Sequence, residues 1–177
     1  MIWFILGPSG VGKSAFGKYL ALKRNWLHIE IDQFPNGDGI DIHGLRHEWD
    51  RFYQQKDPRA IVAELTKRVL TENKNDCVLT FPSGVVLSDE HMRSTNGQIE
   101  IFYLYGSAAH CIRAFLNRER QSRRNLGVDY WTTNNCPSYF LMSMPVFDPN
   151  RVHVFIHSGS RRTHDEVFAE LSKTNSG

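Results

Sequence analysis

The sequence contains no long apolar run. Its longest apolar stretches, Ile2–Leu6 and Ile101–Leu104, are far shorter than the roughly 20 residues that a bilayer-spanning helix needs. No basic residue precedes the first stretch, whereas a secretory signal places positive charge before its apolar segment. We therefore expect a cytoplasmic protein that has no membrane partner.

Cysteine is scarce, and neither sign of charge dominates. The three cysteines, Cys77, Cys111 and Cys136, are odd in number and share no metal-ligand spacing, so we expect free thiols in a reducing compartment. Lysine and arginine total 21 against 19 aspartate and glutamate residues, which gives a formal net charge of +2. So small an excess does not indicate a nucleic-acid partner. The composition leaves the oligomeric state open.

The sequence does have the composition of a globular protein. With 177 residues, of which 41% are hydrophobic, it fits a single compact domain over residues 1–177. Short apolar runs predict strands at Ile2–Leu6, Leu27–Ile31, Cys77–Phe81, Ile99–Tyr105 and Val152–Ile156. Periodicity predicts helices at about Lys13–Lys23, Leu45–Gln55, Ala60–Leu70 and Ser107–Arg120, and a last helix near the capping box Thr163-x-x-Glu166. This alternation predicts an α/β fold with a parallel sheet, helices on both faces and ligands beyond the carboxyl ends of the strands.

Two segments lack such a pattern. Phe34–Gly44 contains three glycines and is predicted to be a loop, within a substrate-binding region over residues 33–60. Residues 121–137 are rich in Arg, Asn and Thr without a clear period, which is typical of a mobile surface lid. An aromatic cluster near the first loop either lines a substrate pocket or belongs to the core; it consists of Trp49, Phe52 and Tyr53.

A phosphate-binding motif follows the first predicted strand. Gly7-Pro8-Ser9-Gly10-Val11-Gly12-Lys13-Ser14 matches G-x-x-x-x-G-K-[ST], in which glycines let backbone N–H groups surround an anion at a helix N-terminus. Lys13 is expected to reach the β- and γ-phosphates, and the Ser14 hydroxyl to bind magnesium. The motif thus predicts ATP and Mg²⁺ as cofactors, with the nucleotide held by Gly7, Ser9, Gly10, Val11, Gly12, Lys13, Ser14 and Ala15. A simple glycine-rich turn is the alternative, but the strand before the motif and the helix after it favour the phosphate loop.

Two carboxylates close the second predicted strand. Glu30 and Asp32 share one face by the two-residue period of a strand. Asp32 is expected to accept a hydrogen bond from the hydroxyl that attacks phosphorus, and Glu30 to hold water on magnesium. A solvated strand end is the alternative. No acid follows the strand at Cys77–Phe81, where a motor-type ATPase or a regulatory GTPase would carry its Walker B residue.

Arginines are concentrated near the predicted lid. Arg113, Arg120 and Arg124 are spaced seven and four residues apart and share one face if the helix continues that far. An arginine that closes over ATP can offset charge on the transferring phosphoryl group, and Arg120 is the best candidate for that catalytic role. A solvated basic face is the alternative.

This layout resembles the shikimate kinase and gluconate kinase group of P-loop small-molecule kinases over most of the chain. The phosphate loop, Glu30-x-Asp32 and the Ser83-Gly84 turn after the third strand carry the resemblance. It implies a P-loop NTPase-type three-layer sandwich, with a five-stranded parallel sheet in the order 2-3-1-4-5 and an arginine-containing lid. It also implies Asp32 on the substrate hydroxyl, Glu30 near magnesium, Arg113 on the adenine and Arg120 on the phosphates. The remaining substrate contacts that it implies are Arg51 or Arg46, Ser83 and Gly84.

The chain departs from the shikimate kinase pattern at two places. Pro82-Ser83-Gly84 stands where those enzymes have a glycine triplet. Asn134–Ser138 lacks the arginine that they carry shortly before the position of Tyr139, where it helps to hold the substrate carboxylate. The resemblance therefore supports a kinase but not shikimate as its substrate.

The predicted function is ATP-dependent transfer of the γ-phosphoryl group to a hydroxyl of a small metabolite. A nucleoside or a nucleoside monophosphate is an alternative acceptor. A non-catalytic ATP-binding module would be expected to lack the strand-end carboxylate or the lid arginines, and this chain has both. An NTP hydrolase would need a Walker B acid after the third strand, which the sequence lacks.

Overall fold

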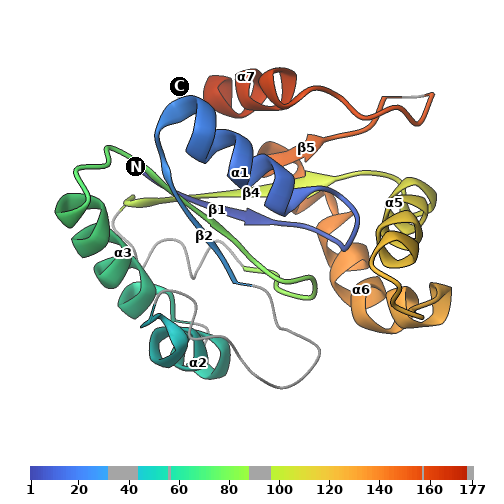
Figure 1. The fold of residues 1–177 in the computed structure, drawn as a ribbon, viewed down its shortest axis with the longest axis horizontal. Coiled ribbons are helices and arrows are strands. Elements are labelled where there is room, and N and C mark those ends of the chain that lie inside the picture. The colour runs from blue at the N-terminus through green and yellow to red at the C-terminus, as the bar shows by residue number, and fades with distance from the viewer. Residues whose placement is uncertain (32–43, 56, 88–96, 157, 175–177) are drawn as a thin grey trace. The chain divides into compact units, whose positions relative to one another are not determined.

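The computed structural model describes residues 1–31, 44–55, 57–87, 97–156 and 158–174 (Figure 1). These residues divide into two compact units. The first contains Met1–Ile5, Ser14–Phe81 and Leu87–Ile101, and the second contains Leu6–Lys13, Pro82–Val86 and Phe102–Gly177. The single domain over residues 1–177 stays a prediction, and much of the predicted substrate region 33–60 lies outside the described residues.

The strands form one five-stranded sheet in the order β2-β3-β1-β4-β5. They are β1 (Ile2–Leu6), β2 (Leu27–Glu30), β3 (Cys77–Thr80), β4 (Ile99–Tyr105) and β5 (Arg151–His153). Parallel registers place Ile2 and Leu27 opposite Cys77, and Tyr103 opposite Arg151. The predicted α/β class and strand order are confirmed.

The described helices alternate with these strands. They are α1 (Lys13–Arg24), α2 (Arg46–Gln55), α3 (Arg59–Thr71), α5 (Ala108–Gln121), α6 (Val128–Met142) and α7 (His164–Thr174), with a 3₁₀ helix η2 (Pro145–Asn150) before β5. The capping box of α7 is confirmed, because Thr163 N donates to Glu166 Oε2 at 2.8 Å and Glu166 N donates to Thr163 Oγ1 at 3.3 Å. In the described parts of the chain, none of the helices combines the length and the apolar character that crossing a membrane requires.

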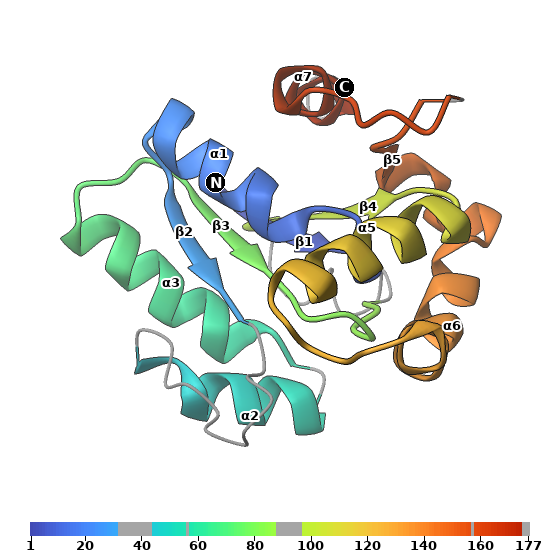
Figure 2. The ribbon, with the colours of Figure 1, turned by 45° about the vertical axis from the view of Figure 1, so that its right-hand side comes forward.

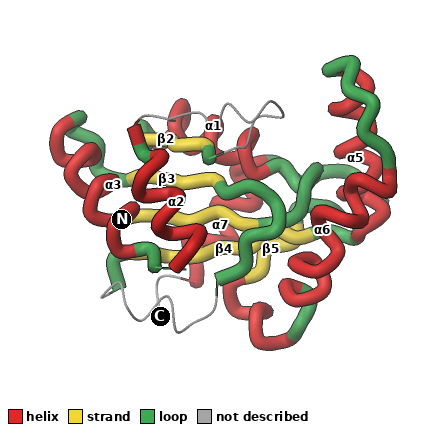
Figure 3. Tube along the Cα trace, turned by 90° about the horizontal axis from the view of Figure 1, so that it is seen from below, coloured by secondary structure: helices red, strands yellow, loops and turns green. Residues whose placement is uncertain are grey.

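In the first unit, helices cover both faces of β2 and β3. Figures 2 and 3 show α1 on one side of these strands and α2 with α3 on the other. His28 and Thr80 face α1: their Nε2 and Oγ1 atoms lie 3.0 Å apart, and a Cβ on Gly17 of α1 would collide with the imidazole. Phe81, the next residue, points to the other face, where its ring lies 5.5 Å from that of Phe52 in α2. The alternation of a strand thus decides which helix each side chain meets.

The aromatic cluster of α2 is divided between core and surface. Phe52 is fully buried and Trp49 is 9% exposed, and the Trp49 ring lies 5.7 Å from that of Phe81. Tyr53 is 54% exposed and lies beside Trp49, with ring centroids 6.0 Å apart. The cluster therefore anchors α2 to the strands through Trp49 and Phe52, and Tyr53 is accessible to solvent.

In the second unit, the main difference from the sequence-based expectation is α6. No regular structure was predicted over residues 121–137, but the chain is helical from Val128 onward. The buried residues of α6 include the polar Asn135 and Ser138, and Pro137 lies inside the helix. Because part of its inner side is polar, the helix has no apolar stripe that periodicity could detect. Its role as a lid stays a prediction.

Candidate active site

The loop between β1 and α1 has the backbone that a phosphate site requires. The φ angle is 146° at Gly7, 87° at Gly10 and 105° at Gly12. A Cβ on Gly10 would overlap the carbonyl oxygen of Cys111 in α5, and a Cβ on Gly12 would overlap the guanidinium of Arg161. Glycine is therefore needed at Gly10 for conformation and for space, and at Gly12 for conformation, since the Arg161 side chain could move aside. Such backbone lets N–H groups turn toward an anion.

Lys13 supplies positive charge to this loop. Its Nζ donates to the carbonyl oxygens of Gly7 at 2.8 Å and of Pro8 at 3.0 Å. It is also the first residue of the 12-residue helix α1, whose N-terminal end carries a positive partial charge. The loop, the ammonium group and the helix end together fit a phosphate group.

Helix α6 contacts the middle of the phosphate loop through polar side chains. Asn135 Oδ1 accepts a hydrogen bond from Ser9 N at 2.7 Å. The indole Nε1 of Trp131 donates to the Ser9 carbonyl oxygen at 2.9 Å. The Ser9 hydroxyl also lies 3.0 Å from that of Ser83, so Ser83 is the predicted substrate residue that the structure brings to the loop.

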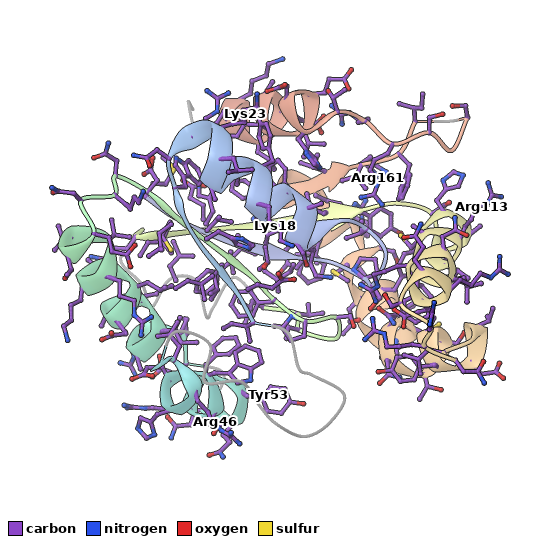
Figure 4. The ribbon with its side chains drawn as sticks, in the orientation of Figure 1. Lys18, Lys23, Arg46, Tyr53, Arg113 and Arg161 are labelled. Carbon is purple, nitrogen blue, oxygen red and sulfur yellow. The ribbon has the colours of Figure 1, made fainter. Side chains whose placement is uncertain are left out.

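Arg161 is a site residue that sequence reasoning missed. It lies between β5 and α7 (Figure 4) and donates to the carbonyl oxygens of Val11 at 3.1 Å and Gly10 at 2.9 Å. Its guanidinium also lies 5.2 Å from the ring of Phe155, and desolvation lowers the pKa of Arg161. The one signal that could have indicated it is its position after the fifth strand, because ligands bind beyond the carboxyl ends of strands.

The predicted magnesium and hydroxyl contacts stay predictions. Ser14 is in the first turn of α1, and Glu30 is the last residue of β2. Asp32 lies outside the described residues. Over the described ranges, no group of three or more His, Cys, Asp or Glu side chains is placed to hold a metal ion. A site with Ser14 and only one or two carboxylates would still suit magnesium, because magnesium keeps several waters as ligands.

Two further predicted nucleotide contacts lie on the loop and the helix that follows it. Val11 is buried, and its carbonyl oxygen is the one that Arg161 contacts. Its N–H donates to the Pro8 carbonyl oxygen at 3.4 Å, within the loop itself. Ala15 lies on α1 and is exposed. Their roles in nucleotide binding stay predictions.

The proposed row of three arginines is interrupted. Arg113 and Arg120 lie exposed on α5, but this helix ends at Gln121. Arg124 lies beyond it and turns back, so that its Nε is 2.8 Å from Oε2 of the buried Glu119. The condition that the helix continues to Arg124 is therefore not met, and Arg113 and Arg120 are left as the arginines of that face.

The other predicted substrate residues are Arg46, Arg51 and Gly84. Arg46 and Arg51 lie on α2 in the first unit, and both contact residues of their own helix. Arg46 Nε is 4.0 Å from Asp50 Oδ2, and Arg51 Nε donates to Gln55 Oε1 at 3.4 Å. Gly84 has a φ of 97° in the turn after β3. Their roles stay predictions.

Comparison with known proteins adds support for the fold. No protein-family model matches the chain, and no curated protein sequence matches it. Solved structures do. A gluconokinase from Sinorhizobium meliloti 1021 is 16% identical over 97% of this chain and 89% of its own, with a TM-score of 0.52. A shikimate kinase from Acinetobacter baumannii, in complex with shikimate, is 14% identical over 99% and 94%, with a TM-score of 0.51.

A third neighbour acts on a different class of compound. It is a deoxyadenosine kinase from M. mycoides with bound dCTP, 14% identical over 100% of both chains, with a TM-score of 0.50. At such low identity these likenesses show the fold alone. The chain therefore has the α/β fold of the P-loop small-molecule kinases, with a glycine-rich loop between β1 and α1.

Proposed function

We propose that the chain is an ATP-dependent phosphotransferase that moves the γ-phosphoryl group to a hydroxyl of a small molecule. The observation that carries this proposal is the loop from Gly7 to Ser14, with its left-handed glycines and the Lys13 ammonium at its carbonyls. Neighbours named as gluconokinase, shikimate kinase and deoxyadenosine kinase have the same fold. A metabolite, a nucleoside and a nucleoside monophosphate are thus the acceptors to test.

Each predicted residue has a chemical task in this reaction. Bound ATP with magnesium would supply the phosphoryl group and neutralise part of its charge. Lys13 and the loop backbone would hold the phosphates, Ser14 would bind the metal and Glu30 would orient its waters. Asp32 would accept a hydrogen bond from the attacking hydroxyl.

The arginines would complete the site. Arg113 would pack on the base of the nucleotide, and Arg120 would offset charge that develops on the phosphoryl group. Arg46 or Arg51 with Ser83 and Gly84 would contact the acceptor. A non-catalytic nucleotide-binding module needs none of these acceptor contacts, and an NTP hydrolase needs an acid after β3 that the sequence lacks.

Lys13→Ala tests the role of the phosphate loop. Because an electrostatic donor to a developing charge contributes about 10²- to 10³-fold to turnover, the variant should lose that much activity while it keeps its fold. Lys18→Ala is the matched control, since Lys18 is an exposed lysine of the same helix (Figure 4). ADP formation should be measured with ATP and magnesium. Normal turnover by Lys13→Ala would contradict the proposal.

The acceptor can be found by thermal shift. ATP, GTP and ADP with magnesium come first, followed by sugar acids, shikimate-like acids, nucleosides and nucleoside monophosphates. A ligand that binds only the folded state adds about 2.7 kcal/mol of stability at a hundredfold excess over its Kd. A shift with ATP and a further shift with one acceptor class would support the kinase. A shift with nucleotide alone would favour the non-catalytic module.

A further inference from the structure

Helix α6 takes both polar groups of one backbone residue in the phosphate loop. Asn135 Oδ1 accepts from the Ser9 N–H at 2.7 Å, and Trp131 Nε1 donates to the Ser9 carbonyl oxygen at 2.9 Å. Asn135 is fully buried and Trp131 is 1% exposed. The side-chain partners are thus shielded from water although Ser9 itself is only half-buried, and both hydrogen bonds are stronger than they would be at the surface.

The amide of Asn135 is held at both ends. Its Nδ2 donates to the Trp131 carbonyl oxygen at 2.8 Å, one turn earlier in the same helix, while its Oδ1 faces Ser9. The Ser138 hydroxyl donates to the Asn135 carbonyl oxygen at 3.0 Å. A flipped amide would lose both of its hydrogen bonds, so these contacts define its orientation. Asn135 is thus a preorganised acceptor for a single loop N–H.

We propose that Trp131 and Asn135 are positioning residues that hold the Ser9 backbone toward α6 and thereby set the affinity of the phosphate loop for nucleotide. The proposal rests on the function proposed above. Because the Ser9 N–H donates to Asn135, this N–H is not available to a phosphate oxygen, and its part in the site is to fix the loop conformation. If Ser9 were released, the first half of the loop would leave its anion-binding conformation part of the time, and affinity would fall in proportion.

We also infer that the uncharged amide of Asn135 favours nucleotide binding. A carboxylate at this position could still accept from Ser9 N, but it would place a negative charge beside a loop that must hold phosphates. Asparagine supplies the same acceptor without that repulsion. Asn135→Asp should therefore weaken nucleotide binding more than Asn135→Ala does, although the aspartate keeps an acceptor.

Trp131→Phe is the mildest test, because it keeps an aromatic ring and removes a single donor. ATP and ADP should bind about three- to tenfold more weakly by isothermal titration calorimetry, which is the range of one net hydrogen bond. Trp26→Phe makes the same chemical change in the first unit and should leave the affinity unchanged. An unchanged Kd in Trp131→Phe would overturn the inference, because a purely structural tryptophan would alter the melting temperature alone.

Asn135→Asp and Asn135→Ala supply the second measurement. The Kd for ADP should rise more in the aspartate variant, and added salt should reduce the difference, because screening weakens charge repulsion. Equal Kd values for the two would overturn the role of charge, and Trp131→Phe decides the positioning role if either variant fails to fold.

The outcomes separate this inference from the proposed function. A chain that binds ADP with an affinity insensitive to Trp131→Phe overturns the inference and leaves the function in place. A chain that binds ADP but transfers phosphate to none of the acceptors overturns the function, while the Kd values still decide the inference. A chain that binds neither ATP nor ADP overturns both.

Discussion

Helices α5 and α6 both contact the phosphate loop, but they do so with different chemistry. Backbone atoms of Cys111 and Phe115 in α5 lie against Gly10, and the side chains of both residues are buried and apolar. Helix α6 reaches Ser9 with an amide and an indole N–H. A helix that packs with apolar side chains can be recognised from its sequence, whereas one that bonds to a loop backbone carries polar residues where the apolar stripe should be.

The largest expected effect on stability is in α5. Phe115 is 1% exposed and its ring is stacked on that of Tyr130 in α6, so Phe115→Ala leaves a cavity and should cost about 3–5 kcal/mol of unfolding free energy. Asn135→Ala leaves the Ser9 N–H without its partner and should cost less, about 1–3 kcal/mol. Urea unfolding measures both.

The comparison between the helices also predicts opposite ranks for function. Both variants must remain folded at the assay temperature. For each kcal/mol of unfolding free energy lost, Asn135→Ala should then raise the Kd for ADP far more than Phe115→Ala does. If both variants lose ADP affinity in the same proportion to their loss of unfolding free energy, the distinction between α5 and α6 is wrong.

The comparison explains how much of the molecule could be predicted from the sequence. β1 and β4 have the bounds that their apolar runs predict, and α5 begins one residue after its predicted start because Ser107 is its N-cap. β5 ends at His153 rather than Ile156, because the chain turns back and Arg162 N donates to the Val154 carbonyl oxygen at 2.9 Å. Local patterns thus predict elements well when the local sequence alone decides them.

The candidate site also contains a part that the local sequence predicts and a part that it does not. The phosphate loop is a local motif, and its residues follow one another in the chain. Ser9 and Asn135, in contrast, are 126 positions apart, and no local pattern links them. The helix predicted to end at Arg120 ends at Gln121, but the face shared with Arg124 does not form, because the chain leaves the helix and Arg123 adopts a left-handed φ of 55°, a conformation that sequence seldom predicts for a residue other than glycine. Asp32 lies outside the described residues and stays a prediction.

The cysteines of the two helices provide a pH-dependent comparison. Burial raises the pKa of the Cys111 thiol in α5 to about 12, whereas Cys136 in α6 is exposed. Between pH 9 and 12, the unfolded chain loses the Cys111 proton while the folded chain keeps it, so the unfolding free energy should fall as pH rises. Cys111→Ala should make that fall less steep. Urea unfolding at pH 8, 9.5 and 11 measures the slopes.

A thiol reagent at pH 8 gives a check that needs no variant. Cys136 should react in the native state, and Cys111 should react only after unfolding, because thiolate is the reactive form. Fast modification of Cys111 in the folded protein, located by peptide mass, would contradict the assigned burial.

The smallest expected effect is at Arg161, which contacts the loop from neither helix. Its guanidinium donates to Gly10 and Val11, but it is only partly desolvated, so water still competes for these hydrogen bonds. Arg161→Met should raise the Kd for ADP about threefold, within the range of one net hydrogen bond. Arg161→Lys keeps the charge but cannot donate to both carbonyl oxygens as a guanidinium does, so its Kd for ADP should lie between those of the wild type and Arg161→Met. If Arg161→Met weakens binding as much as Asn135→Asp does, the loop depends on the β5–α7 segment as strongly as on α6, and the polar contacts of α6 lose their special importance.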